Sequence, residues 1–251
     1  MKILITSSGH IRDLIRQMLL ELWARNIKAI EPDIDVLYID SSSPVDAAAI
    51  LAPFGFKDLG DIDDDCPIDL SAGGRFACRF PTPDWGHRSN EGGRAVRKGL
   101  KAAIDNGYDY VFYWESDVLI SRSVRTEVEK MARNGVKVTM PLSIEYHFCH
   151  TELCVYECNY LRETGFVDSY NWHHDDMAHE GADEQRRERA HRDVLYCNFW
   201  RGRQNDQEWV RQGNFLECAR MSDGSIQLDW ISHCADFTLY LKFLQINGVK
   251  I

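Results

Sequence analysis

The chain has 251 residues, of which 44% are hydrophobic, and this is enough to build the core of one α/β domain. Its 39 acidic residues outnumber its 29 Lys and Arg residues. The resulting charge of −10 argues against a protein that coats DNA generally, although a local basic face is still allowed. The longest apolar runs are too short to span a bilayer. Eight cysteines in a chain of this length do not indicate a disulfide framework, so we expect a cytoplasmic protein with reduced thiols.

The first fifty residues predict a β-α-β-α unit. Residues 2–6 form a short apolar strand, and residues 7–9 are expected to turn after it. Apolar side chains between positions 11 and 23 recur at helical spacing, which predicts an amphipathic helix. Residues 35–39 predict a second strand and residues 45–51 a second helix. This order implies parallel strands that are joined by right-handed crossovers.

The following elements continue the α/β pattern after an acidic interruption. Residues 57–69 are acidic and irregular, and they predict a solvated loop. Asn90 is suited to cap a helix that ends at residues 106–107, where an Asn-Gly pair stands. A further helix is expected to stop at an Asn-Gly pair at residues 134–135, and a strand follows it over residues 136–140.

The central pattern is a strand that ends in two acids. Residues Tyr110–Trp114 form an unbroken β-branched and aromatic run, long enough for one buried strand. Glu115 and Asp117 follow it two positions apart, so in an extended segment their side chains point to the same side. Paired carboxylates at the carboxyl edge of a sheet suit Mg²⁺ or Mn²⁺, although a solvated strand-to-turn junction has the same pattern.

Residues 89–120 resemble the middle of family 2 and related GT-A glycosyltransferases. In that family an Asn-x-Gly helix start and a helix ending in Gly lead, through a hydrophobic strand, to an Asp-x-Asp motif. The resemblance implies a GT-A fold, an α/β architecture with a mostly parallel central sheet flanked by helices. It identifies Glu115-Ser116-Asp117 as the motif, with Glu in place of the first Asp. Because Glu is longer than Asp, the implied metal contact is more secure for Asp117.

The same resemblance implies where a UDP-sugar donor binds. Asp40 matches the acid that contacts the uracil, and Arg94 lies near the diphosphate or the uracil. Two glycines and an arginine at a helix start also suit a phosphate-facing element, although a Gly-Gly pair is as often only a tight turn. The predicted donor-binding residues are Thr6, Ser7, Asp40, Asn90, Gly93, Arg94, Glu115 and Ser116.

Two segments of the second half extend the resemblance. Residues 205–213 resemble the family's acidic helix, and Asp206 matches the general base beside the acceptor hydroxyl. Asp206 is also a residue that only favours the dipole of a helix N-terminus. Residues 226–233 resemble the strand that ends in a metal-binding histidine, so His233 is the predicted third metal ligand. A lone histidine on a strand is often only hydrogen-bonded.

A second candidate for the base precedes Asp206. Residues 165–168 resemble the Gly-Phe-Asp turn that the family places just before its acidic helix. Asp175 and Asp176 follow this turn, so either of them competes with Asp206 for the role of general base. We leave the three acids open at this point.

An arginine-rich stretch follows, and it offers contacts for an anionic acceptor such as DNA. It is also typical of a solvated helix face. The candidate DNA contacts are Arg186, Arg187, Arg189, Arg192, Arg201 and Arg203. Aromatic residues interleave with the last two, as they do in grooves that bind nucleic acid.

Cysteine and histidine residues cluster between positions 147 and 158. The members are His147, Cys149, His150, Cys154 and Cys158. A structural zinc site is one interpretation, but no Cys-x-x-Cys pair supports it. Buried thiols in strands are the default.

We therefore predict one GT-A glycosyltransferase domain over residues 1–251. Residues 1–140 are expected to bind the nucleotide sugar and residues 141–251 the acceptor, with an acceptor-side insertion near 144–205. The predicted reaction is the Mn²⁺- or Mg²⁺-dependent transfer of a sugar from a UDP-sugar to a hydroxyl. That hydroxyl belongs to a hydroxymethylated DNA base, as in viral DNA-modifying enzymes, or to a saccharide or protein. The alternatives are a nucleotidyltransferase, which the absence of a Gly-rich basic loop after the first strand opposes, and a non-catalytic nucleic-acid-binding module.

Overall fold

The computed structural model describes residues 1–81, 88–116, 119–120, 123–140, 142–143, 148–149, 153–169, 194–196 and 230–231. Within these ranges the elements follow one another as β1 (Ile3–Gly9), α1 (Leu14–Ile30), β2 (Asp35–Ser41), α2 (Ala47–Leu51), η1 (Ala52–Phe54), β3 (Phe56–Asp61), β4 (Arg75–Phe80), α3 (Arg88–Asp105), β5 (Tyr110–Trp114), β6 (Leu119–Ile120), α4 (Arg125–Asn134), β7 (Val138–Met140), β8 (Leu142–Ser143), β9 (Phe148–Cys149), β10 (Leu153–Glu157), α5 (Cys158–Thr164), α6 (Phe166–Ser169), β11 (Val194–Tyr196) and β12 (Trp230–Ile231).

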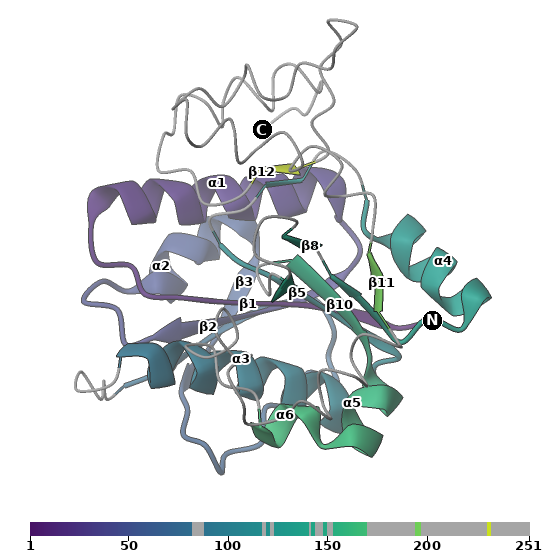
Figure 1. Cartoon of the computed structure of the whole chain (residues 1–251). Helices are drawn as coiled ribbons and strands as arrows, with labels where there is room; N and C mark the ends of the chain where they lie inside the picture. The colour runs from purple at the N-terminus through teal and green to yellow at the C-terminus, as the bar shows by residue number, and fades with distance from the viewer. Residues whose placement is uncertain are drawn as a thin grey trace, which may run out of the picture.

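The main sheet has eight strands in the order β11-β7-β10-β5-β1-β2-β4-β3. Strand β10 runs antiparallel to its neighbours β5 and β7, and the other neighbouring pairs are parallel. Helices cover both faces: α1 and α2 lie on one, and α3, α5 and α6 lie on the other (Figure 1). The predicted α/β fold with a mostly parallel central sheet is therefore confirmed.

The core on the α1 face is built around an aromatic cluster. Trp23 of α1 is fully buried, and its ring centroid lies 5.8 Å from that of Tyr38 and 5.9 Å from that of Trp114. These partners stand on β2 and β5, with β1 between those two strands, so one helical side chain bridges across the middle of the sheet. Tilted aromatic pairs of this kind add about 0.5–1.5 kcal/mol beyond the burial of their area.

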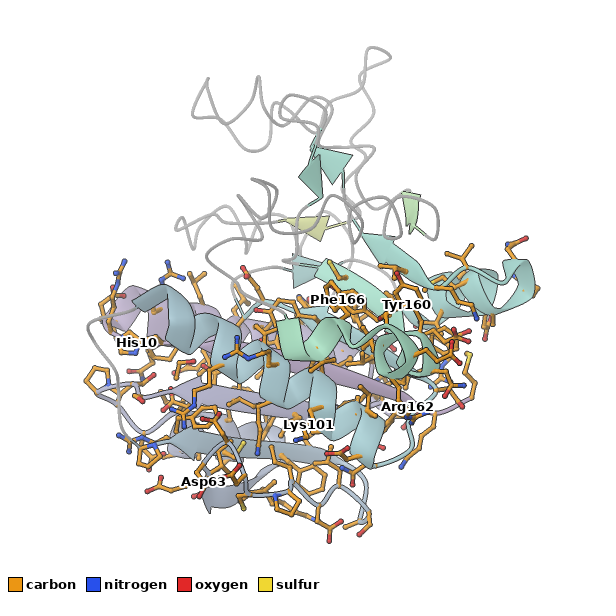
Figure 2. All side chains as sticks on the ribbon, turned by 60° about the horizontal axis from the view of Figure 1, so that its bottom comes forward. His10, Asp63, Lys101, Tyr160, Arg162 and Phe166 are labelled. Carbon is orange, nitrogen blue, oxygen red and sulfur yellow. The ribbon has the colours of Figure 1, made fainter. Side chains whose placement is uncertain are left out.

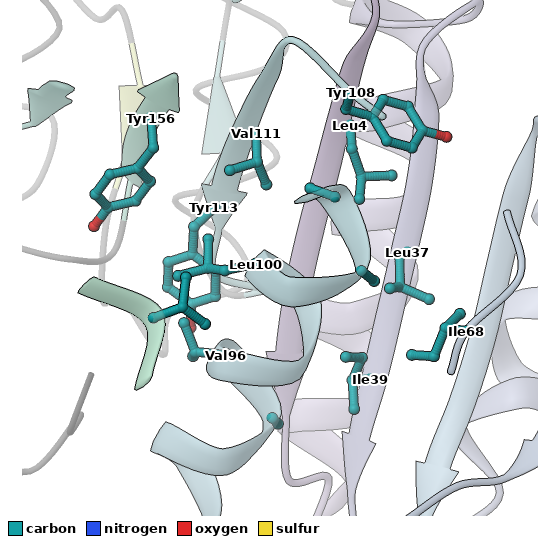
Figure 3. Packing of buried hydrophobic residues seen from close by; sticks show 14 of the residues in the cluster. Leu4, Leu37, Ile39, Ile68, Val96, Leu100, Tyr108, Val111, Tyr113 and Tyr156 are labelled. Carbon is teal, nitrogen blue, oxygen red and sulfur yellow. The ribbon is translucent and has the colours of Figure 1, made fainter. Parts of the chain in front are cut away.

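The core on the opposite face packs α3 against the same three strands. Val96 and Leu100 of α3 belong to the same buried cluster as Leu4 of β1, Leu37 of β2 and Val111 of β5 (Figure 3). All of these side chains are at most 1% exposed. Burying each of them contributes about 1.5–3 kcal/mol relative to exposure, so α3 is held firmly along the sheet.

Local signals explain where the helices begin and end. The Asp13 carboxylate accepts a hydrogen bond from the Arg16 N–H at 2.8 Å, so α1 begins at Leu14, after the buried Ile11 rather than with it. Helix α4 ends as predicted at Gly135, whose φ of +64° is the left-handed conformation that glycine tolerates best. In the described parts of the chain, no helix combines the length and apolarity that crossing a membrane requires.

Two boundaries near the carboxyl edge of the sheet differ from the predicted ones. Strand β1 continues through residues 7–9, which were expected to turn, because Ser8 and Gly9 pair in register with Ile39 and Asp40 of β2. Helix α3 begins at Arg88, so Asn90 lies inside it and is not its cap.

Two strands were absent from the prediction. Residues 56–61 form the edge strand β3 rather than the start of a solvated loop, because β4 pairs with residues 56–58 and, after a shift in register, with Asp61. Strand β4 itself was not predicted. The remainder of the predicted loop is largely exposed, with Ile68 and Ile62 buried on the α3 face.

The path of the chain reverses direction across the sheet at β1. From β1 the chain moves outward through β2 to β3 and β4, with α1 and α2 on one face. Helix α3 then crosses the opposite face and delivers β5 to the other side of β1 (Figure 1). The connections on the two sides of β1 therefore run over opposite faces, with α1 between β1 and β2 and α3 between β4 and β5. Such a switch point is where open α/β sheets bind ligands.

Candidate functional site

The carboxyl ends of β1, β2 and β5 meet at one end of the molecule. Gly9, the last residue of β1, lies opposite Asp40 in the register with β2. A Cβ atom placed on Gly9 would lie 2.9 Å from the Ser116 hydroxyl and 2.8 Å from the Tyr38 hydroxyl. The segments after β1 and β5 are thus in direct contact at the switch point. His10 marks this end of the molecule, opposite Arg162 of α5 (Figure 2).

Asp40 is the centre of a buried polar cluster at the end of β2. Its carboxylate accepts a short hydrogen bond from the Ser43 hydroxyl and hydrogen bonds of 3.2 Å from the Ser43 N–H. The Ser43 hydroxyl in turn accepts from the Ile11 N–H at 2.7 Å, which ties the loop after β1 to the loop after β2. The Arg79 Nε lies 3.7 Å from the carboxylate, because Arg79 of β4 lies opposite Asp40 in the register with β2. His10 Nδ1 lies 2.9 Å from the Ser41 carbonyl oxygen and completes the cluster.

The charge of Asp40 is costly in this environment. Its side chain is 3% exposed, and burial raises its pKa from 3.8 to about 6. The hydrogen bonds from Ser43 and the charges of Arg79 and His10 act in the opposite direction and limit the increase in pKa. A buried carboxyl group that keeps a perturbed pKa at a sheet edge is a candidate for a functional group.

Glu115 occupies the matching position after β5. It is 8% exposed, and its carboxylate accepts a hydrogen bond of 3.4 Å from the Tyr113 hydroxyl. The Tyr113 hydroxyl also lies 3.4 Å from the Ser8 hydroxyl on β1. Glu115 is therefore held at the switch point by neighbours from both strands, and its oxygen atoms are ligands that Mg²⁺ or Mn²⁺ accepts.

Arg94 approaches the same edge from α3. Its guanidinium carbon lies 3.9 Å from the ring centroid of Phe80, the last residue of β4. Its Nε donates to the Asp64 carboxylate at 2.8 Å. Gly93 is buried beside it, whereas Asn90 is placed only by its backbone in α3. A positive charge is thus fixed at the carboxyl edge, within the element predicted to face phosphates.

Thr6 and Ser7 lie deeper in the sheet than the other predicted donor contacts. Each is 1% exposed, and Thr6 lies directly beneath Gly99 of α3. The Ser7 hydroxyl has no hydrogen-bond partner among the described residues. Their predicted position near a nucleoside remains a prediction.

Several predicted functional residues fall outside the described ranges. These are Asp117, Asp175, Asp176, Asp206, His233, Arg186, Arg187, Arg189, Arg192, Arg201 and Arg203. Within the described part of the chain, no group of three or more His, Cys, Asp or Glu residues is arranged to hold a metal ion. The metal site, the base and the arginine contacts therefore remain predictions.

The proposed zinc cluster is described only in part. Cys154 and Cys158 are buried thiols outside any disulfide, as expected for cysteines in packed elements. Burial raises the pKa of Cys158 to about 12. The side chains of the other three members are outside the described part.

Sequence reasoning missed the partners of Asp40. Arg79 belongs to β4, and the largely apolar run over residues 76–80 is the signal that would have found this strand. Ser43 was not among the predicted site residues, although a serine three residues after an acid suits a local hydrogen bond.

No family model matches the sequence, and no curated protein matches it either. Solved structures do resemble it. Mannosyltransferase PcManGT from Pyrobaculum calidifontis, in complex with GDP-Man and Mn²⁺, has 12% identity and a TM-score of 0.44 over 65% of this chain and 46% of its own. TarS from S. aureus, in complex with UDP-GlcNAc, has 12% identity and a TM-score of 0.43 over 66% of this chain and 48% of its own.

The galactosyltransferase LgtC, in complex with donor and acceptor sugar analogs, has 14% identity and a TM-score of 0.49, over 99% of this chain and 95% of its own. The chain spans about half the length of the TarS fragment and of the mannosyltransferase. At TM-scores below 0.5 these likenesses alone assign neither a family nor an activity. The case for a function rests on the residues at the carboxyl edge of the sheet.

Proposed function

We propose that this chain is a GT-A glycosyltransferase that transfers a sugar from a UDP-sugar to a hydroxyl acceptor. The observation that carries the proposal is the placement of two buried acids at the switch point. Asp40 is the penultimate residue of β2 and Glu115 follows β5, on either side of β1. Burying two carboxyl groups at one edge costs free energy, and a ligand that needs their oxygen atoms would account for this arrangement.

The donor would bind along this edge, with its uracil at the end of β2 and its leaving group near the segment after β5. Asp40 lies where the uracil is expected, and its carboxylate can accept the N–H of the base. Arg94 supplies a positive charge that complements the diphosphate. Glu115 and Ser116 stand at the start of the segment expected to face the leaving group. The fixed side chains in this arrangement come from β2, α3 and the loop after β5.

A divalent cation fits this donor set, because carboxylate oxygens are hard ligands. Glu115 would hold it together with Asp117 and His233. When bound, such an ion supplies positive charge that stabilises a departing diphosphate. The chain's own contribution to the other half of the reaction is a base that accepts the proton of the attacking hydroxyl, for which Asp206, Asp175 and Asp176 are the candidates.

The first test is a turnover assay with Mn²⁺ or Mg²⁺ and a panel of nucleotide sugars, in which release of free UDP is measured. Glu115→Gln should lower the rate about 100-fold or more, as removal of one charge-stabilising group typically does. Glu129→Gln, at an exposed glutamate of α4, is the matched control and should leave the rate unchanged. Absence of binding or hydrolysis of every donor with either metal would refute the proposal.

The acceptor is a separate question and needs its own measurement. We propose a hydroxyl on a hydroxymethylated DNA base or on a saccharide or protein, and the arginine-rich stretch supports the first. Mass spectrometry of hydroxymethylated DNA after incubation with enzyme and donor would show the added sugar mass. If the DNA gains no sugar mass while a saccharide does, DNA is excluded as the acceptor. Asp117→Ala distinguishes a transferase, which loses turnover, from a nucleic-acid-binding module, which keeps its affinity.

A further inference from the structure

We infer that Asp64 is a positioning residue for Arg94, which orients the guanidinium toward the anionic part of the donor. This inference depends on the proposed function. It assigns a role to the acidic loop, defined here as residues 62–66, which precedes β4 and which the sequence pattern indicated only as solvated. Asp63 marks this loop in Figure 2.

The first support is the way Asp64 and Phe80 hold Arg94 from two directions. The Asp64 carboxylate accepts from Nε at 2.8 Å, so it engages the inner nitrogen of the guanidinium. The flat face of the group lies over the Phe80 ring, 3.9 Å from its centroid. An ion pair in the plane and a ring against the face together fix both the position and the tilt of a guanidinium. The Arg94 side chain is accordingly only 23% exposed, although it is on the surface of the fold.

The second support is that Asp64 is itself anchored to α3. Lys98 lies one helical turn after Arg94, and its ammonium donates to the Asp64 carbonyl oxygen at 2.8 Å and to the Cys66 carbonyl oxygen at 2.5 Å. Lys98 is 7% exposed, so these bonds are sheltered from water. The carboxylate and the carbonyl of one loop residue therefore bind two consecutive turns of the same helix.

The acidic loop also stiffens itself. The Asp63 carboxylate accepts from the Asp65 N–H at 3.0 Å and from the Cys66 N–H at 2.6 Å, which closes a local turn around Asp64. An exposed loop without such bonds would have to lose conformational freedom when a ligand binds. Here folding has already ordered the loop, so binding of a ligand would not have to order it.

The third support is the fixed position of Phe80. It is fully buried at the end of β4, and it pairs with Ser41 in the register between β2 and β4. Its carbonyl oxygen accepts from the Ser42 hydroxyl at 2.6 Å. Ser41 directly follows Asp40 in the chain, so the same two strands position both the expected uracil contact and the ring beneath Arg94. The guanidinium and the buried acid are thus set relative to each other by sheet register.

The test is a double-mutant cycle on UDP affinity, measured by calorimetry with the full chain in the presence of Mn²⁺. Arg94→Ala should weaken UDP binding about 10-fold to 100-fold, the range for a charged hydrogen bond. Asp64→Ala should weaken it about threefold to tenfold, because a partly exposed ion pair contributes less. Asp64→Glu should recover part of the loss. In the turnover assay Asp64→Ala should raise KM for the donor and leave kcat within about twofold.

The decisive comparison is Asp64→Ala in the Arg94→Ala background, where it should have no further effect, because Asp64 acts only through Arg94. Asp65→Ala is the matched control, since it removes the same charge from the same loop and should leave affinity unchanged. The inference is wrong if the Asp64→Ala variant binds UDP as tightly as the wild type or more tightly. It is also wrong if Asp64→Ala weakens UDP binding equally in the wild-type and Arg94→Ala backgrounds. If the wild type binds neither UDP nor any nucleotide sugar, the proposed function fails and this inference with it.

Discussion

At the scale of single residues, the buried carboxyl group of Asp40 has an electrostatic cost that depends on pH. Its pKa is raised from 3.8 to about 6 because burial disfavours its charged form. Between these pH values the folded protein binds more protons than the unfolded chain, so the free energy of unfolding falls as pH rises. The stabilising contribution of Asp40 is complete below about pH 4 and is lost as pH rises through about 6, a difference of about 3 kcal/mol.

Asp40→Asn should therefore stabilise the protein at pH 7.5 by about 1–3 kcal/mol, while having little effect near pH 4. The neutral amide keeps an oxygen for the Ser43 N–H but removes the buried charge. Urea unfolding at several pH values measures the difference. Glu129→Gln, at an exposed site, should show no such pH dependence. The same Asp40→Asn variant should bind UDP more weakly if Asp40 contacts the uracil, and equal stability of wild type and variant across the pH range would contradict the cost assigned to burial.

Among the elements, α3 matters most because it forms the crossover to β5 and carries Arg94. Its close approach to β1 depends on Gly99, where an added Cβ would overlap Thr6 Oγ1 and lie 3.1 Å from Thr6 Cβ. Alanine is the better helix former by about 1 kcal/mol, so helix propensity alone predicts that Gly99→Ala stabilises. The contact with a backbone-anchored threonine predicts the opposite.

Gly99→Ala should destabilise the fold by about 1–3 kcal/mol, the usual cost of inserting atoms into a packed interface. Thermal or urea unfolding measures it. The matched comparison is Thr6→Ala, alone and combined with Gly99→Ala, because removing the threonine hydroxyl and methyl makes room for the new Cβ. In the Thr6→Ala background the Gly99→Ala substitution should cost markedly less. An equal cost in both backgrounds would show that the substitution acts elsewhere in α3.

For the molecule as a whole, the reversal of the chain at β1 decides where a ligand can bind. The end of β1 and the segment after β5 touch at Gly9, with the Ser116 hydroxyl 2.9 Å from the position of an added Cβ. Gly9→Ala should push the segment after β5 away from β1 and weaken UDP binding about threefold to tenfold, equivalent to about 1 kcal/mol. Calorimetry with UDP measures this change.

Gly55→Ala provides the control for a general effect of glycine replacement. Gly55 lies between η1 and β3, at the amino ends of the strands, whereas the switch point lies at their carboxyl ends. Its φ is +87°. Alanine there should lower stability by about 1–2 kcal/mol through backbone strain and leave UDP affinity unchanged. If both variants weaken UDP binding equally, the switch point has no special role.

The sequence by itself determined the elements whose signals are local. Residues Tyr110–Trp114 form β5 with the predicted bounds, because an unbroken apolar run has no alternative to burial. The Asn-Gly pairs at 106–107 and 134–135 mark helix ends, since glycine adopts the left-handed conformation there without strain. The opening β-α-β-α order was predictable for the same reason, because the spacing of apolar residues within each element indicates a helix or a strand.

Only the tertiary structure decided which strands are neighbours and what the polar side chains contact. Strand β3 is exposed over most of its length and exists because β4 pairs with it. The insertion of the antiparallel β10 between β5 and β7 joins segments about forty residues apart, and no local pattern encodes such a pairing. The ion pair of Arg94 with Asp64 joins positions 30 residues apart. Long-range pairing depends on the total free energy of the packed sheet, whereas helix ends and buried strands depend on the few residues that compose them.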